Sequence, residues 1–159
     1  MKKLCFTLVA IVLSFSIMLT GCGTGPKISI GNGKGSEGDV VEIKLNINNN
    51  PGIWGGQIII DYNYINLSFE SVSNGTVFET CEANNTGKCV VLVVTHTISS
   101  DSQLKNSTAD GIVATLKFKV KTGATKGKYD LIVNSESNFC NANEEMIELT
   151  FDSGEIKVK

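Results

Sequence analysis

Apolar and polar residues alternate in short stretches over most of the chain, which is the pattern of strands that bury one face. In the stretch 41–47, Val, Ile, Leu and Ile alternate with Glu, Lys and Asn. The same period of two recurs at 112–120, 129–133 and 156–158. No stretch beyond the N-terminal region shows a helical period over ten residues. The pattern therefore predicts an all-β chain.

Two runs of the chain are continuously apolar instead of alternating. Residues 58–60 are three isoleucines, and residues 90–94 are four valines and a leucine. Such runs indicate strands that are buried on both faces, or that keep one face for a partner. Turn residues separate the segments at 48–52, 74–75, 84–87, 122–123 and 126–127. We count nine or ten short strands, and their spacing indicates a β-sandwich or jelly roll.

The N-terminus has a different pattern. Two lysines precede an apolar run at 4–19, and the run ends in a cluster of small residues. A positive region, an apolar core and a small residue before the cut are the parts of a bacterial export signal. The alternative is an uncleaved membrane anchor, but the run of about sixteen residues is shorter than the roughly 20 that a span needs. We therefore predict a signal peptide over residues 1–21.

The four residues 19–22, Leu-Thr-Gly-Cys, resemble a lipobox, the signature of bacterial lipoproteins. This resemblance implies that Cys22 becomes the first mature residue and carries a thioether-linked lipid. We expect residues 22–27 to be the lipidated cysteine and a short tether, and residues 28–159 to be one domain. The chain is then extracytoplasmic and lipid-anchored to the cell membrane of a bacterium. Several acyl chains anchor stably, whereas one holds only marginally.

Charge and composition exclude several functions. Two of the fourteen lysines leave with the signal, so twelve remain against sixteen Asp and Glu, and the chain has no arginine. Nucleic acid is not an expected partner, because binding it needs a clustered basic face. The sequence offers no nucleophile elbow, metal-ligand set or phosphate loop. We therefore predict that the chain is not an enzyme and binds no cofactor or metal.

Three cysteines remain besides Cys22. Cys81 and Cys89 flank a polar stretch at 82–88 that is expected to be a loop, and an exported compartment permits disulfides. A bond between them would close a nine-residue loop and add about 2.5 kcal/mol of stability. We predict the Cys81–Cys89 disulfide, which leaves Cys140 unpaired. Pairing of Cys140 with either partner, or three reduced thiols, stays open because spacing does not decide connectivity.

Four stretches of the domain, taken in order, resemble a cohesin. They are a Gly-Asp turn at 35–41, a Gly-Ile-Trp-Gly-Gly-Gln-Ile strand with an Asp-Tyr-Asn turn at 52–67, a long alternating strand at 110–120, and closing strands at 139–158. Cohesins are jelly-roll modules that capture dockerin modules in bacterial cellulosomes and related cell-surface assemblies. The resemblance implies a nine-stranded β-sandwich with jelly-roll topology, similar to carbohydrate-binding modules, and a non-catalytic role.

The resemblance also implies where a partner binds. Family members bind dockerin through one sheet face, which falls here on strands near 55–61 and 88–97, with help from 143–147. By the period of two, alternate residues of the first strand share one side. The expected contact residues are Gly55, Gln57, Ile59, Asp61, Val93, Thr95, His96, Glu144 and Met146. The alternative is that Ile59 and Val93 point inward and serve the core.

This chain departs from the family at several of these positions. Gly55 has no side chain where cohesins present a polar one, and His96 stands where Glu is common. Glu144 and Met146 stand where Leu and Glu are usual. The implied partner is a secreted protein with a divergent dockerin, unless the chain has lost that partner. By the same resemblance the partner is an enzyme acting on polysaccharide, and calcium belongs to the dockerin.

A carbohydrate-binding lipoprotein is the alternative function. It shares the sandwich architecture and the location, and polysaccharide would then be a direct partner. It requires Trp54, Tyr62 and Tyr64 to line one exposed face as a sugar-stacking platform. Packing is the plainer interpretation of Trp54, which is a lone Trp beside two glycines in a strand. A purely structural role in an envelope complex also remains open.

Neither the single histidine nor the adjacent acidic pair predicts catalysis. His96 has no adjacent Ser or Cys nucleophile. Glu144 and Glu145 are expected on a strand, where successive residues face opposite ways. They therefore do not form a paired acid and base.

Overall fold

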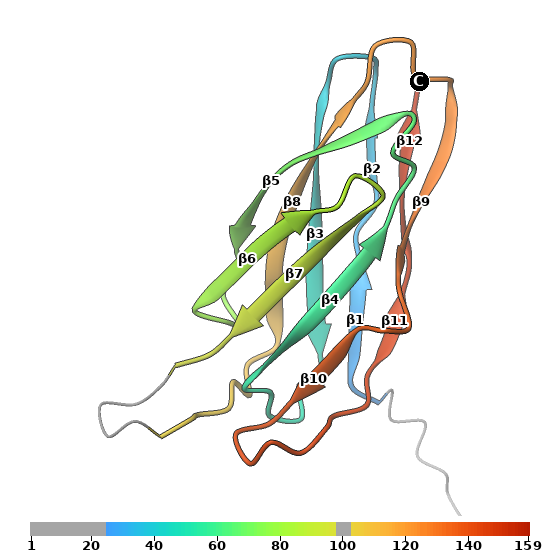
Figure 1. Cartoon of the computed structure of the whole chain (residues 1–159). Coiled ribbons are helices and arrows are strands. Elements are labelled where there is room, and N and C mark those ends of the chain that lie inside the picture. Colours follow the sequence, from blue (N-terminus) through green and yellow to red (C-terminus); the bar gives the residue numbers. More distant parts are fainter. Residues whose placement is uncertain (1–24, 98–102) are drawn as a thin grey trace, which may run out of the picture.

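The computed structural model describes residues 25–97 and 103–159 and shows two β-sheets packed face to face (Figure 1). The described residues form twelve strands and no helix. Accordingly, no helix in this part of the chain is long and apolar enough to cross a membrane. The expected signal peptide at 1–21 and the expected lipidation of Cys22 lie outside the described residues.

The five-stranded sheet is built around β3 (Val40–Asn48) and β8 (Gly111–Val120), which pair antiparallel along most of their length. β5 (Leu67–Asn74) extends the sheet beside β8, and β1 (Lys27–Ile30) extends it beside β3. β11 (Thr150–Asp152) pairs parallel with β1 and completes the order β11-β1-β3-β8-β5. Segments from the two ends of the domain therefore meet at one sheet edge.

The seven-stranded sheet is built around β4 (Gly55–Asp61), which pairs antiparallel with β7 (Cys89–Thr95) along its whole length. Beyond β7 lies the edge strand β6 (Thr80–Asn85). On its other side, β4 pairs with β10 (Asn138–Cys140) at its start and with β9 (Gly127–Val133) at its end. β4 is thus hydrogen-bonded on both sides.

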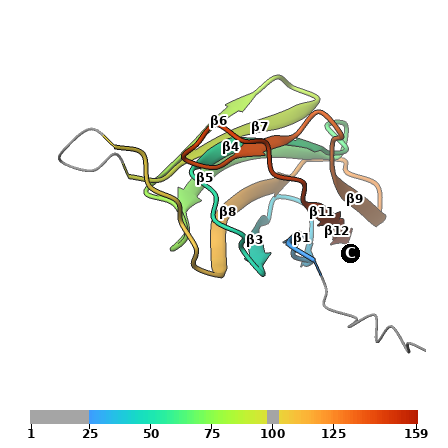
Figure 2. The same ribbon diagram turned by 90° about the horizontal axis from the view of Figure 1, so that it is seen from below.

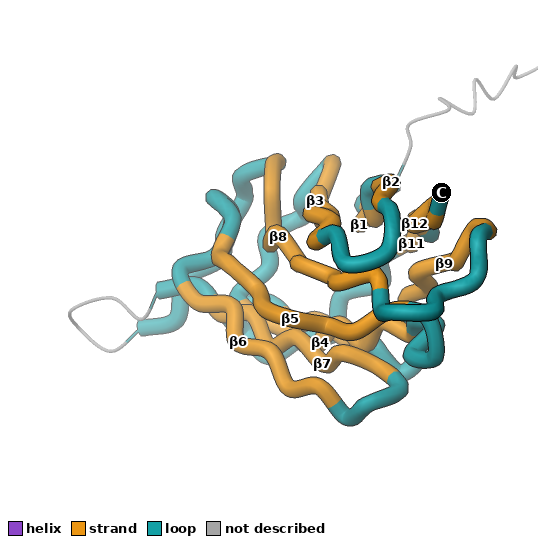
Figure 3. Tube along the Cα trace, turned by 90° about the horizontal axis from the view of Figure 1, so that it is seen from above, coloured by secondary structure: helices purple, strands orange, loops and turns teal. Residues whose placement is uncertain are grey.

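Two further strands complete this sheet. β12 (Gly154–Val158) pairs antiparallel with β9 and parallel with β2 (Gly33–Gly35). The order is β2-β12-β9-β4-β7-β6, with β10 beside β4. Seen from below, β4, β6 and β7 form one layer, and β1, β3 and β8 form the other (Figure 2). The view from above shows strands joined by loops and turns (Figure 3).

The core lies between the sheets because each long strand turns a row of apolar residues inward. These rows supply fully buried side chains, among them Ile43, Leu45, Ile47, Ile58, Ile60, Leu92, Leu116 and Leu131. Phe118 packs against two further rings, with centroid distances of 5.2 Å to Tyr62 and 5.7 Å to Phe69. Burial of apolar surface on this scale is the main force that holds two sheets together.

The predicted all-β sandwich is confirmed, but the count of nine strands is wrong, since the described residues form twelve. β2, β10 and β11 have three residues each, which is too short to show a period of two. Lys27, expected in the tether, already pairs with Asn48 and Thr150 in β1. The stretch 82–88, expected as a loop, is partly strand, because β6 extends to Asn85.

The predicted Cys81–Cys89 disulfide is wrong, because the thiols of Cys81, Cys89 and Cys140 are all free. Cys81 lies opposite Val94, five residues further along β7 than Cys89. At roughly 3.4 Å a residue this separates the two cysteines by about 17 Å along the hairpin, whereas bridged Cα atoms lie roughly 4–7 Å apart. Strand register, which the spacing in the sequence does not reveal, therefore rules out the bond.

The buried thiol of Cys81 predicts a pH dependence of stability. Burial raises its pKa from 9.0 to about 11. Between these values the folded state keeps the proton while the unfolded state releases it, so stability falls as the pH rises from about 9 to 11. Below this window both states are protonated. We expect the free energy of unfolding in urea to fall less steeply across it in Cys81→Ala than in the wild type.

If the free energy of unfolding fell equally steeply with pH in the wild type and in Cys81→Ala, the result would contradict the burial of the Cys81 thiol. The comparison of slopes is needed because tyrosines and lysines titrate in the same range, and both proteins share them.

Candidate protein-binding face

Most of the predicted partner-binding residues come from β4 and β7, which lie side by side in the seven-stranded sheet (Figure 1). Ile58 and Ile60 enter the core, so Ile59 between them faces outward, opposite Val91 on β7. We call this surface the β4–β7 face. Its outward residues are Gly55, Gln57, Ile59 and Asp61 from β4; Val91, Val93 and Thr95 from β7; Thr80, Glu82 and Asn84 from β6; and Asn138 and Cys140 from β10.

The centre of the β4–β7 face is an apolar strip. Val93 is 48% exposed, whereas Ile59 is 9% exposed. The loop after β9 lies beside Ile59, whose N–H donates to the Ser137 hydroxyl at 2.9 Å and whose carbonyl accepts the N–H of Asn134 at 2.8 Å. Both side chains point away from the space between the sheets, but Ile59 is buried on that outer side. Val93 is the more accessible of the two.

Polar side chains border this strip. The register places Gln57 between Val93 on β7 and Asn138 on β10. Glu82 is exposed and lies on the other side of Val93, on β6. An apolar centre with a polar rim is typical of surfaces that bind proteins.

The two ends of the face are also polar. Asp61, the last residue of β4, accepts a hydrogen bond from the side-chain amide of Asn134 at 3.1 Å. At the opposite end, the hydroxyl groups of Thr95 and Thr80 bond to each other across β7 and β6. The strip is therefore enclosed by side chains that hydrogen-bond readily to a partner.

The remaining predicted residues lie at the border of the face rather than on it. His96 follows β7, and its backbone N–H donates to the carbonyl of Trp54 at 2.7 Å. Met146 is 69% exposed and pairs through its backbone with Cys140, which places it beside β10. The structure thus gathers the β4 and β7 residues on one surface and leaves Glu144 in the turn beyond it.

This turn, at 141–145, corrects the prediction that Glu144 and Glu145 lie on a strand. The Asn141 side chain closes it by accepting the backbone N–H groups of Asn143 at 2.9 Å and Glu145 at 3.0 Å. Glu144 itself has a left-handed φ of 64°. Asn side chains commonly form such turns. The Asn-Ala-Asn run at 141–143 was therefore the sequence signal for it.

Two glycines let the neighbouring strands approach β4 closely, Gly56 on the side of β10 and Gly55 on the side of β7. A Cβ on Gly56 would lie 2.4 Å from the carbonyl oxygen of Asn138 and 2.5 Å from the ring of Phe139. A Cβ on Gly55 would lie 2.9 Å from the carbonyl oxygen of Val94. Real Cβ atoms do not approach so near, so packing explains why Gly55 carries no side chain for a partner.

Gly56→Ala should therefore destabilise the domain. The added methyl group forces β10 and the Phe139 ring to shift, and overpacking of this kind costs about 1–3 kcal/mol. Urea denaturation of the variant and the wild type would measure the loss. Gly25→Ala is the control, since no atom lies within 4 Å of a Cβ at that position. Equal stability of all three proteins would contradict the close approach of β10.

Several residues of the face were missed by sequence reasoning. Alternation along 88–97 places Val91 on the same side as Val93 and Thr95, but Val91 was left out of the expected contact residues. Asn138 and Cys140 lie on β10, whose three residues show no recognisable period. Glu82 fell in a stretch expected to be a loop.

The aromatic residues considered for sugar binding do not share a surface. Tyr62 is only 7% exposed, since its ring packs against Phe118. Trp54 precedes β4 and Tyr64 follows it, so the length of the strand, about 23 Å, separates them. These three residues therefore form no stacking platform.

Within residues 25–97 and 103–159, no group of three or more His, Cys, Asp or Glu side chains is placed to hold a metal ion. The chemistry that this surface offers is hydrogen bonding and apolar contact.

Comparison with known proteins assigns the family. The Cohesin domain model matches residues 26–158, and the chain therefore belongs to the cohesin family. Cohesin domains are non-catalytic protein-binding modules. No curated protein matches the chain.

Solved structures share the fold at low sequence identity. CaCohA2 from Clostridium acetobutylicum has a TM-score of 0.74 and 22% identity, covering 85% of this chain and 91% of that one. The OlpA cohesin from Clostridium thermocellum, solved in a complex with the dockerin Doc918, has a TM-score of 0.72 and 16% identity, covering 85% and 99%. A non-cellulosomal cohesin from the archaeon Archaeoglobus fulgidus has a TM-score of 0.69 and 16% identity, covering 85% and 91%.

Proposed function

We propose that the chain is a membrane-tethered, non-catalytic module that captures a dockerin-bearing secreted protein through the β4–β7 face. The observation that carries this proposal is the exposed side chain of Val93 at the centre of a sheet face with a polar rim. Family membership supports it, and so does the OlpA cohesin, which was solved with a dockerin bound.

A rigid sheet face suits this role. β4 is hydrogen-bonded to β7 on one side and to β10 and β9 on the other. Little conformational entropy is then lost when a partner docks, because the contact surface is already ordered. On binding, the apolar strip at the centre is removed from water, which favours the complex. The polar residues around it set the orientation of the partner.

The partner is a divergent dockerin in this proposal. Gly55 presents only backbone, and Gln57 is the amide nearest to Val93 on β4. Two carboxylates, Asp61 and Glu82, stand on the rim. A matching surface offers an apolar side chain for Val93 and hydrogen-bond donors for the rim. Calcium belongs to the partner, whose loops it keeps folded.

The lipid anchor sets where capture takes place. In the proposal Cys22 carries the lipid, and the chain is next fixed at Pro26, whose carbonyl accepts the N–H of Thr150 at 3.0 Å. The residues between Cys22 and Pro26 span at most about 14 Å, so the domain stays close to the membrane. The captured protein, an enzyme acting on polysaccharide by analogy with the family, then works at the cell surface.

Capture of secreted proteins on the immobilised protein tests this function. Proteins from the culture medium are bound with and without EDTA and identified by mass spectrometry. We expect proteins with paired calcium-loop repeats to bind and EDTA to release them, because a dockerin without calcium loses its fold. If no such protein is captured, dockerin binding is contradicted, whereas the assignment of the fold still holds.

Val93→Ala tests the face itself. Truncation of an exposed apolar anchor should reduce the binding free energy of the captured partner by about 1–2 kcal/mol. Isothermal titration calorimetry measures this loss. The matched control is Val40→Ala, because Val40 is 53% exposed on β3 of the other sheet. Both variants should keep the wild-type melting temperature. Equal affinity of the two variants would show that the partner binds elsewhere.

A further inference from the structure

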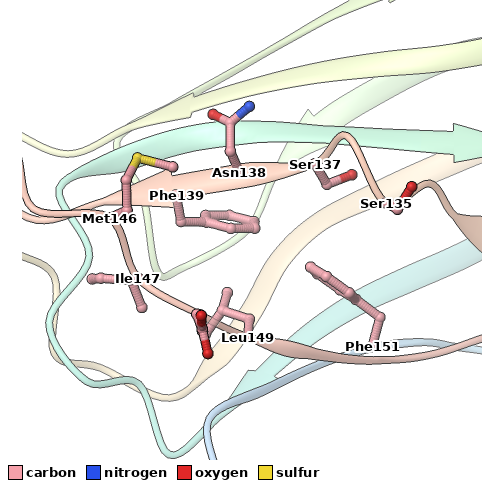
Figure 4. A pocket seen from close by; sticks show the side chains of 9 residues that line it. Ser135, Ser137, Asn138, Phe139, Met146, Ile147, Leu149 and Phe151 are labelled. Carbon is pink, nitrogen blue, oxygen red and sulfur yellow. The ribbon is translucent and has the colours of Figure 1, made fainter.

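A hollow of about 430 Å³ lies beside the β4–β7 face, where the edges of the two sheets separate. One wall is β10, which belongs to the seven-stranded sheet, and the other is the segment 146–151, which leads into β11 of the five-stranded sheet. The N–H of Ile147 donates to the carbonyl of Phe139 at 2.9 Å and joins the two walls. Figure 4 shows the rings of Phe139 and Phe151 on opposite sides of this space.

The floor of the hollow is apolar. Phe139, Ile147, Leu149 and Phe151 line it, and the rings of Phe139 and Phe151 lie 6.4 Å apart between centroids. An apolar floor of this kind takes a side chain with a hydrocarbon body.

A single ionisable residue, Glu148, lines the hollow, and it is exposed. None of the three ion pairs of the described residues, Lys27–Asp152, Lys117–Glu42 and Lys128–Glu155, includes Glu148. The first of them lies next to the hollow, because Asp152 follows the lining residue Phe151. From residue 129 to residue 154 the chain has six acidic residues and no lysine or arginine. Glu148, which belongs to none of these ion pairs, therefore favours a cation in the hollow.

We propose that the hollow receives a Lys or Arg side chain of the same secreted partner that docks on the β4–β7 face. This inference rests on the proposed function. The aliphatic stem of the basic side chain packs on Leu149 and Phe151, and its charged end reaches the Glu148 carboxylate. The half-buried ring of Phe151 adds a favourable contact for the cation, whereas Phe139 is only 1% exposed.

One partner can reach both places. Asn138 and Met146 line the hollow, and Asn138 also belongs to the β4–β7 face, which Met146 borders. A purely apolar side chain fits this site less well, because it would remove water from the Glu148 carboxylate without giving it a partner. The hollow is thus a second contact that selects partners by charge.

A probe that needs no dockerin tests the chemistry of the hollow. The ¹⁵N-labelled protein is titrated with N-acetylarginine amide and, separately, with N-acetylnorleucine amide, which has a hydrocarbon stem without the charge. We expect the arginine probe to shift the amide signals of Ile147, Glu148 and Leu149, and Glu148→Gln to suppress these shifts. Equal shifts with both probes would show an apolar occupant, and no shift would show no such site; either result overturns the proposal.

The captured partner tests the hollow as part of the interface. Glu148→Lys should weaken its binding about tenfold, as expected for a charge pair at an interface. The matched control is Glu37→Lys, which makes the same charge change at an exposed turn between β2 and β3. Equal affinity of the two variants would overturn the second contact while leaving dockerin capture in place. If no dockerin is captured at all, the proposed function fails, and with it the assignment of the occupant to that partner, whatever the probe shows.

Discussion

β10 approaches β4 so closely that no side chain fits at residue 56, and the ring of Phe139 occupies the space that such a side chain would take. The pairing of β10 with β4 places Asn138 and Cys140 on the outer face of the sheet, beside Gln57 and Gly55. The carbonyl of Cys140 in turn accepts the N–H of Trp54 at 2.9 Å, which fixes the start of β4. The β4–β7 face and the hollow next to it therefore depend on the same packed pair of strands.

β4 serves the core with one row of side chains and the candidate face with the other. Ile58 and Ile60 are buried between the sheets, while the side chains of Gln57 and Ile59 face away from the core. A shift of one residue in its pairing would exchange the two rows and bury Gln57 in the core. The seven continuous pairs with β7 prevent that shift, so the register that stabilises the fold also positions the residues of the candidate face.

The long alternating stretches were the predictable part of the fold. Residues 41–47 and 112–120 became β3 and β8, because five or more alternating positions indicate a buried face without further information. Three-residue strands carry no such pattern and are defined only by their neighbours, so β10 and its contribution to the face escaped detection.

Other parts of the site depended on register rather than on spacing. The three isoleucines at 58–60 did not reveal which one faces outward until β4 was paired. The same limitation produced the wrong disulfide. Only seven residues lie between Cys81 and Cys89 along the chain, but the strand pairing places them at opposite ends of the β6–β7 hairpin. Asn141 shows the converse, because a local side-chain turn was readable from the sequence and was overlooked.

The position of β1 has a mechanical consequence. It is the first strand of the described residues, and it lies between β3 on one side and β11 on the other. A pull on the N-terminus, such as drag on a bound cargo would produce, runs along β1 and loads the hydrogen bonds on both of its sides in shear. Those bonds must then break together rather than one after another. Under the proposed anchoring through Cys22, the strand nearest the anchor is held on both sides against such a pull.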